Sequence, residues 1–116
     1  MSDHSLKKID GSASPTGEMG QHYLASGTSV SMRLWKESTG EGGEPHSRPY
    51  ETVGYVVSGR VEIHAGDSVI SCGARDSYLV PEGLEHRYQV TEDLVAVEAT
   101  APPARVDDRD DGSAKA

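Results

Sequence analysis

Residues 45–64 read PHSRPYETVGYVVSGRVEIH, and this stretch carries the strongest structural signal in the chain. Two runs rich in β-branched residues, 52–57 and 60–64, have the length of strands and are separated by a serine–glycine pair typical of turns. In the second run apolar and polar residues alternate, so Val61 and Ile63 are expected to point inward. The stretch therefore predicts two strands of a β-rich fold.

Strand-length runs recur on both sides of this stretch, with glycine or polar turns between them. In residues 28–36, Val30, Met32 and Leu34 alternate with polar residues, which predicts a half-buried strand with these three side chains on its inner face. The other runs have β-branched or aromatic content and cover 68–72, 77–80, 85–91 and 94–99. Short strands at such close spacing predict an antiparallel β-barrel or sandwich.

The apolar residues are concentrated in the middle of the chain. Leu, Ile and Val number 20 of 116 residues, which beside a net charge of −8 is typical of disorder, but 14 of them lie in residues 50–99. We therefore expect one folded domain over 21–100, a flexible N-terminal arm over 1–20, and a disordered acidic tail over 101–116.

Charge and hydropathy exclude several classes of protein. No apolar run approaches the roughly 18–20 residues needed to cross a bilayer, and no apolar stretch follows the first lysines, so neither a membrane span nor a secretory signal is expected. Residues 37–100 hold 12 acidic and four basic side chains, which disfavours binding to a phosphate backbone. Cys72 is the only cysteine, so no disulfide can form within the chain. We expect a cytoplasmic protein that binds neither membranes nor nucleic acid.

The spacing of histidine, proline and glycine residues resembles the two motifs of the cupin family. Six positions stand at the family's spacing: Gly40, His46 and Gly59 for the first motif, and Pro81, Gly83 and His86 for the second. The resemblance covers roughly residues 21–100 and implies the family's all-β fold, a double-stranded β-helix or cupin jelly-roll barrel. Cupins are commonly dimers, so the resemblance also implies a homodimer.

Four positions depart from the cupin motifs, and most of them bear on chemistry. Family members with complete motifs hold a divalent transition metal with three histidines and a glutamate. The departures are Arg48 for the second histidine, Thr52 for the glutamate, Val90 for an asparagine and Arg75 for a turn glycine. A metal held by His46 and His86 is disfavoured, because a guanidinium stays protonated and cannot coordinate. Gly73 is expected to take the tight backbone angle in place of Arg75.

The side chains expected to point into the barrel are His46, Arg48, Tyr50, Thr52, His86 and Tyr88. These side chains provide a guanidinium, two imidazoles, a hydroxyl and two phenols within an apolar barrel. Such a pocket suits a small anion, and Arg48 would bind two of its oxygens. We therefore expect a protein that binds a small, anionic metabolite as its ligand.

Three alternatives stay open at this point. In the first, Arg48 pairs with an acidic side chain and the pocket is a polar-lined core without a ligand. In the second, the protein is a metal-dependent enzyme of the dioxygenase or isomerase type that uses His46 and His86 with irregular additional ligands. In the third, a metal-free isomerase uses His86 as a general base.

Three other residues are not expected to form part of the site. Alternation places Glu51 on the opposite face from the missing glutamate, so it is expected to be an exposed charge. His22 is expected to be a surface or core histidine rather than a third ligand. Trp35 is opposite in alternation to the apolar residues of its strand and is expected to face outward, at a subunit contact or under the N-terminal arm.

Overall fold

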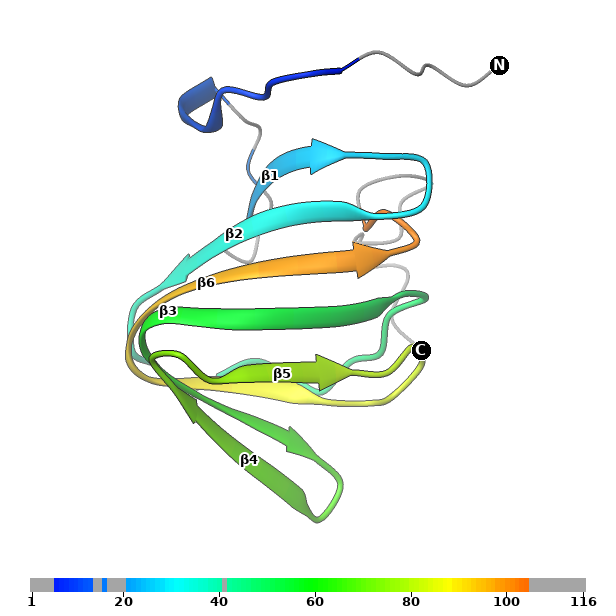
Figure 1. Cartoon of the computed structure of the whole chain (residues 1–116). Helices are drawn as coiled ribbons and strands as arrows, with labels where there is room; N and C mark the ends of the chain where they lie inside the picture. The colour runs from blue at the N-terminus through cyan, green and yellow to red at the C-terminus, as the bar shows by residue number, and fades with distance from the viewer. Residues whose placement is uncertain (1–5, 14–15, 17–20, 41, 105–116) are drawn as a thin grey trace.

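The computed structural model describes residues 6–13, 16, 21–40 and 42–104 (Figure 1). Its elements are the 3-10 helix η1 (Gly11–Ala13) and the strands β1 (Gln21–Ser26), β2 (Ser31–Glu37), β3 (Glu51–Ala65), β4 (Ser68–Gly73), β5 (Ser77–Val80) and β6 (Arg87–Ala101). Every pairing between these strands is antiparallel, and the fold is all-β, as predicted. Within the described ranges, no helix has the length and apolar character needed to span a membrane.

One curled sheet forms the body of the molecule. The strand order is β1-β2-β6-β3-β4, and β5 pairs with the first part of β3. The strands β3 and β6 pair along nearly their whole length, and each has one part in either half of the sheet. Figure 1 shows both long strands bending sharply at one end of the molecule, so that the two halves of the sheet come to face each other.

The two long strands correct part of the sequence prediction, which placed four separate strands where β3 and β6 lie. The register between them shifts at three points: between Val56 and Ser58, between Ser58 and Arg60, and between Arg60 and Val61. Such β-bulges bend a strand without ending its pairing. Gly59 lies at this bend with φ of 87°, a left-handed angle that glycine adopts without strain. A serine–glycine pair suits both a turn and a bulge, so composition alone does not distinguish them.

The core lies between the two halves of the sheet. Its buried members come from five strands: Trp35, Val56, Val61, Ile63, Cys72, Tyr78, Val80, Val90, Leu94 and Ala96. The inward orientation predicted for Val61 and Ile63 is confirmed. The polypeptide stays packed beyond residue 100, since Ala104 is buried and its backbone N–H donates to Thr100 Oγ1 at 2.9 Å. Residues 105–116 of the predicted tail, and most of the predicted arm, lie outside the described residues.

The two faces of β2 are reversed relative to the prediction. The side chains expected on the inner face are exposed or half-buried: Val30, Met32 and Leu34. Arg33 and Trp35 point inward instead, and Trp35 is only 5% exposed. Alternation shows which residues share a face but not which face is inside. Trp35 therefore does not face outward, and it no longer indicates a subunit contact.

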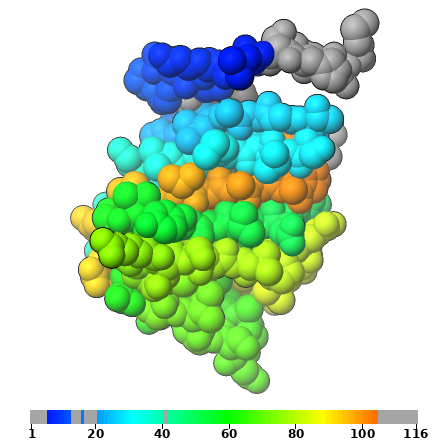
Figure 2. Space-filling model, viewed as in Figure 1, coloured from blue at the N-terminus to red at the C-terminus, as the bar shows by residue number. Residues whose placement is uncertain are grey.

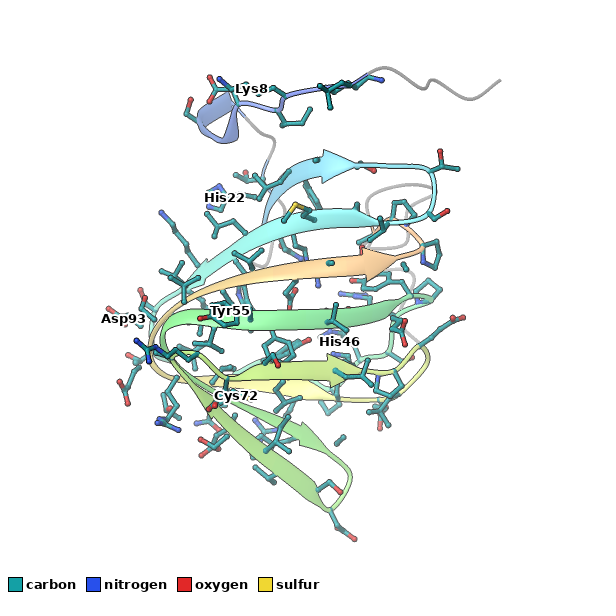
Figure 3. The ribbon with its side chains drawn as sticks, viewed as in Figure 1. Lys8, His22, His46, Tyr55, Cys72 and Asp93 are labelled. Atoms are coloured by element: carbon teal, nitrogen blue, oxygen red, sulfur yellow. The ribbon has the colours of Figure 1, made fainter. Side chains whose placement is uncertain are left out.

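The outer face of the sheet is apolar over β2, β5 and the parts of β3 and β6 that pair with them. Met32, Ala99, Val53 and Leu79 form one cross-strand row over β2, β6, β3 and β5. Figure 2 shows these four strands side by side on this face, and Figure 3 labels Tyr55 of β3 on it. Large apolar side chains of this face are 42–53% exposed: Met32, Val53, Tyr55, Val57 and Leu79. The homodimer itself stays a prediction.

Arg75 takes the left-handed turn conformation that was predicted for Gly73. Its φ is 79°, whereas Gly73 remains in β4 and pairs with Arg60. The turn is fixed by backbone hydrogen bonds, since the N–H of Arg75 donates to the carbonyl of Val56 at 2.9 Å. For an L-residue other than glycine, this conformation costs about 1–2 kcal/mol of free energy.

Replacing Arg75 by glycine is expected to raise the free energy of unfolding. Glycine removes the left-handed strain, and its larger unfolded-state entropy offsets part of the gain. We expect a net gain of about 0.5 kcal/mol, or roughly 2–4 °C in Tm, measured by urea and thermal unfolding. The matched control is Arg75→Ala, which removes the same charge but keeps the Cβ. Equal stability of the two variants would show that the backbone angle carries no cost.

Candidate functional site

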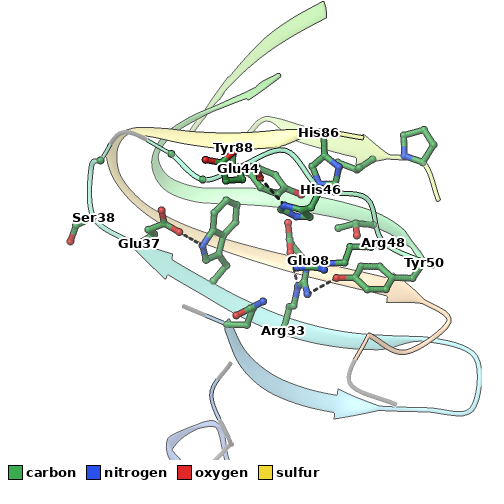
Figure 4. Close-up of a pocket in the computed structure, with 18 of the residues that line it drawn as sticks. Arg33, Glu37, Ser38, Glu44, His46, Arg48, Tyr50, His86, Tyr88 and Glu98 are labelled. Atoms are coloured by element: carbon green, nitrogen blue, oxygen red, sulfur yellow. Dashed lines mark hydrogen bonds and ion pairs between the residues drawn. The ribbon is translucent and has the colours of Figure 1, made fainter. Parts of the chain in front are cut away.

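A pocket of about 580 Å³ opens into the curled sheet (Figure 4). All six residues that the sequence predicted to point inward line it: His46, Arg48, Tyr50, Thr52, His86 and Tyr88. It is also lined by residues of β1 and β2 and by the loop that follows β2. Glu51 is exposed, as expected, and is absent from the lining of this pocket, as is His22. The structure thus brings the predicted residues together, while their role in binding stays a prediction.

The two histidines are held side by side by a short antiparallel bridge. The backbone N–H of His46 donates to the carbonyl of His86 at 2.9 Å, and the reverse bond has the same length. Each ring places its Nδ1 near the carbonyl two residues earlier, at 3.2 Å from Glu44 O and 2.8 Å from Leu84 O. Because a carbonyl only accepts, both Nδ1 atoms carry the proton, and a neutral ring then has Nε2 as its acceptor.

Four aromatic rings form a continuous wall on one side of the pocket. The centroid distances are 4.9 Å from His46 to His86, 5.0 Å from His86 to Tyr88 and 4.7 Å from Tyr88 to Trp35. The last two contacts are edge-to-face, with interplanar angles of 87° and 67°. We call these four residues the aromatic wall. Edge-to-face contacts are favoured by the ring quadrupoles, so the rings hold one another in place.

A buried ion pair that the sequence reasoning missed lies against the pocket. Arg33 Nε donates to Glu98 Oε1 at 2.7 Å, and the second carboxylate oxygen accepts from the hydroxyl of Tyr78 at 2.5 Å. Arg33 also donates to the hydroxyl of Tyr50 at 3.2 Å. Burial, together with the negative charge of Glu98, raises the pKa of Tyr78 well above its usual value, so Tyr78 remains a hydrogen-bond donor.

One sequence signal for this pair exists in β6. Glu98 shares its face with Leu94 and Ala96, which belong to the core. A carboxylate on a buried face requires an internal partner, because an unpaired buried charge is costly. That partner is Arg33, which lies directly opposite Glu98 in the register of β2 and β6.

Arg48 adds a second guanidinium to the pocket. Arg48 is only 8% exposed. Its backbone carbonyl accepts a hydrogen bond from the N–H of Gly83 at 3.0 Å, which links Arg48 to the segment before His86. Among the described lining residues, the buried charged ones are two arginines, Arg33 and Arg48, and one acid, Glu98. Glu37 and Glu44 line the pocket too but are exposed, so the formal excess of positive charge is confined to the buried residues among those described.

The residues present do not fit the divalent metal of complete cupin motifs. His46 and His86 supply two imidazoles, but the other two positions hold Arg48 and Thr52, a cation and a poor ligand. The carboxylate of Glu98 already accepts hydrogen bonds on both oxygens. In the part of the chain that the structure describes, no three His, Cys, Asp or Glu side chains gather as a metal site. We therefore derive no chemistry through a metal here.

Burial lowers the pKa of His86 below its usual 6.5, and the charges of Arg48 and Arg33 add to this effect. The carbonyl of Leu84 and the carboxylate of Glu98 oppose it. Between the lowered pKa and 6.5 the unfolded chain binds more protons at this position than the folded chain. The contribution of His86 to stability therefore falls as the pH is lowered from about 6.5 through the folded-state pKa.

We expect His86→Gln to reduce the loss of stability on acidification. The measurement is the free energy of urea unfolding of wild type and variant at several pH values between 7.5 and 5. The control is His64→Gln, which removes a histidine outside the pocket that pairs with Glu62 at 3.0 Å. If wild type and His86→Gln lose stability in parallel, the buried imidazole is not the group that titrates.

The comparisons with known proteins agree with this geometry. The cupin domain family matches residues 33–100. An RmlC-like cupin from Shewanella frigidimarina has a TM-score of 0.74 at 20% identity, over 89% of this chain and 96% of that one. KdgF from Halomonas sp. has a TM-score of 0.74 at 20% identity, over 90% and 98%. EutQ from Clostridium difficile has a TM-score of 0.61 at 14% identity, over 84% and 75%.

These likenesses differ in what they establish. At 20% identity or less the solved structures show a common fold, and no curated protein matches the sequence. The family match is stronger, because residues 33–100 are more than half of the 116. The all-β curled sheet, the paired motif histidines and this match lead to one conclusion: the chain belongs to the cupin domain family.

Proposed function

We propose that this cupin-domain protein binds a small anionic metabolite in its pocket and that Arg48 is the main contact for the anion. The observation that carries the proposal is that two guanidinium groups, those of Arg33 and Arg48, are buried in the pocket lining together with a single buried carboxylate among the described residues, that of Glu98. Glu37 and Glu44 also line the pocket, but they are exposed. Because Arg33 already donates to the carboxylate of Glu98, we assign the anion to the guanidinium of Arg48. In a partly dehydrated pocket a charge-assisted hydrogen bond is stronger than one in water, and a guanidinium can bind two oxygens at once.

The neighbouring groups suit the same ligand. Thr52 is buried in the pocket and provides a hydroxyl beside the expected anion site. The Nε2 atom of His86 would accept a hydrogen bond from a hydroxyl group of the ligand. A volume of about 580 Å³ lies within the range of roughly 300–1,000 Å³ typical of small-molecule sites. Binding therefore requires no rearrangement of the curled sheet.

The alternative is a metal-dependent cupin enzyme, and one observation favours it. In metal sites, the ring nitrogen opposite the ligating one commonly donates to a carbonyl, as Nδ1 does in both His46 and His86. Two imidazoles beside a guanidinium would hold such a metal weakly. The two proposals therefore differ in the metal content of the purified protein.

The test combines metal analysis with calorimetry on the full chain, purified without an affinity tag. We expect iron, manganese, nickel and zinc far below one per chain, and saturable binding of benzoate or another carboxylate. Benzamide, the neutral counterpart of benzoate, is expected to bind at least ten-fold more weakly. Near-stoichiometric metal that is lost in His46→Ala or His86→Ala would overturn the proposal, as would equal affinity for benzoate and benzamide.

A further inference from the structure

We propose that the ligand is a ring-bearing carboxylate, with its carboxylate at Arg48 and its ring against the aromatic wall. This inference rests on the proposed function, since it presupposes an anion at Arg48. The inference goes beyond the proposed function by naming the class of compound that fills the rest of the pocket.

The first support is the size of the pocket. About 580 Å³ is far more than acetate, formate or phosphate can fill, and it falls in the range of sites for larger organic ligands. A small anion bound alone at Arg48 would leave the aromatic wall in contact with water. A ligand that also covers this apolar surface gains affinity from its burial.

The second support is the separation of charge from aromatic surface. Figure 4 shows Arg48 and Tyr50 at one end of the pocket, Tyr88 toward the other, and the two imidazoles between them. The wall thus leads away from the guanidinium, over three successive ring contacts of 4.7–5.0 Å. A compound with a carboxylate at one end and a ring at the other matches this order of groups.

The third support is the chemistry of the wall itself. The ring surfaces of Tyr88 and Trp35, beyond the two imidazoles, attract rings through dispersion and through the ring quadrupole. Val80 and Pro81 also line the pocket and add apolar surface. Together with the carboxylates of Glu37 and Glu44, which also line the pocket, these contacts favour a ring over a flexible dicarboxylic acid chain.

Trp35 makes the inference directly measurable, because it is the only tryptophan of the chain and lies in the wall. The experiment titrates the full-length protein with benzoate, cyclohexanecarboxylate and acetate, while tryptophan fluorescence and calorimetry are followed. We expect the two ring compounds to bind at least ten-fold more tightly than acetate and to change the emission of Trp35. A greater affinity for benzoate than for cyclohexanecarboxylate would assign a flat aromatic ring, and equal affinity would assign a ring of either kind.

The variants Tyr88→Leu and Tyr55→Leu complete the test. Tyr88 belongs to the aromatic wall, whereas Tyr55 is exposed on the outer face of the sheet. We expect Tyr88→Leu to reduce the preference for benzoate over acetate at least three-fold and Tyr55→Leu to leave it unchanged. If Tyr88→Leu does not fold, the comparison of ligands on the wild type decides alone.

The outcomes separate this inference from the proposed function. If acetate binds as tightly as benzoate, the ring-bearing class is wrong while anion binding at the pocket stands. If no carboxylate binds at all, or if benzamide binds as tightly as benzoate, the proposed function itself fails.

Discussion

Replacing Glu98 by alanine is expected to lower the free energy of unfolding by about 3–5 kcal/mol, the cost of breaking a buried ion pair by removal of one partner. The side chains of Arg33 and Glu98 are only 8% and 2% exposed, so the guanidinium left without its carboxylate is largely shielded from bulk solvent. The variant also removes the acceptor of the Tyr78 hydroxyl. For a domain of this size such a loss corresponds to a fall in Tm of more than about 10 °C.

Urea unfolding of the variant and two companions checks this expectation. The control is Glu92→Ala, because Glu92 pairs with Arg60 at 3.5 Å but is 65% exposed, and surface pairs contribute at most about 1 kcal/mol. A double variant, Arg33→Met with Glu98→Leu, removes both charges and is expected to regain much of the lost stability. A loss in Glu98→Ala no larger than that in Glu92→Ala would show that the pair does not stabilise the fold.

Replacing Arg48 by glutamine is expected to weaken the binding of benzoate at least 30-fold. The substitution keeps a polar side chain but removes the positive charge, and hydrogen bonds to charged groups contribute about 1.5–3 kcal/mol each. Calorimetric titration of the folded variant measures the effect. Arg60→Gln is the matched control, since Arg60 lies outside the pocket lining and is half exposed in its pair with Glu92.

Two results of comparing these variants would contradict the prediction for Arg48. If Arg48→Gln binds benzoate within three-fold of wild type, the guanidinium of Arg48 does not bind the carboxylate. If Arg60→Gln loses as much affinity as Arg48→Gln, the effect comes from the overall charge of the protein rather than from the pocket. Circular dichroism of both variants establishes that each is folded before it is titrated.

The sequence predicted the fold well because its signals are local. Alternation in 60–64 placed Val61 and Ile63 in the core, and the spacing around His46 and His86 indicated that the two histidines lie in related motifs. The structure brings their rings to 4.9 Å and places all six predicted residues around one pocket.

The features that the sequence did not predict depend on pairing between strands that are far apart in the sequence. An arginine on β2 reads as a surface residue until Glu98, 65 positions later, is known to lie opposite it. For the same reason the inner face of β2 was assigned wrongly, and Trp35 was expected outside. The left-handed angle at Arg75 was missed because its backbone hydrogen bond to Val56, not its residue type, fixes the turn.

The most direct test of the account is a crystal structure of the full chain grown with benzoate. It should show the two carboxylate oxygens about 2.7–3.0 Å from the guanidinium of Arg48 and the ring against Tyr88 and His86. Benzoate bound elsewhere, or a metal ion between the imidazoles of His46 and His86, would contradict the proposed site.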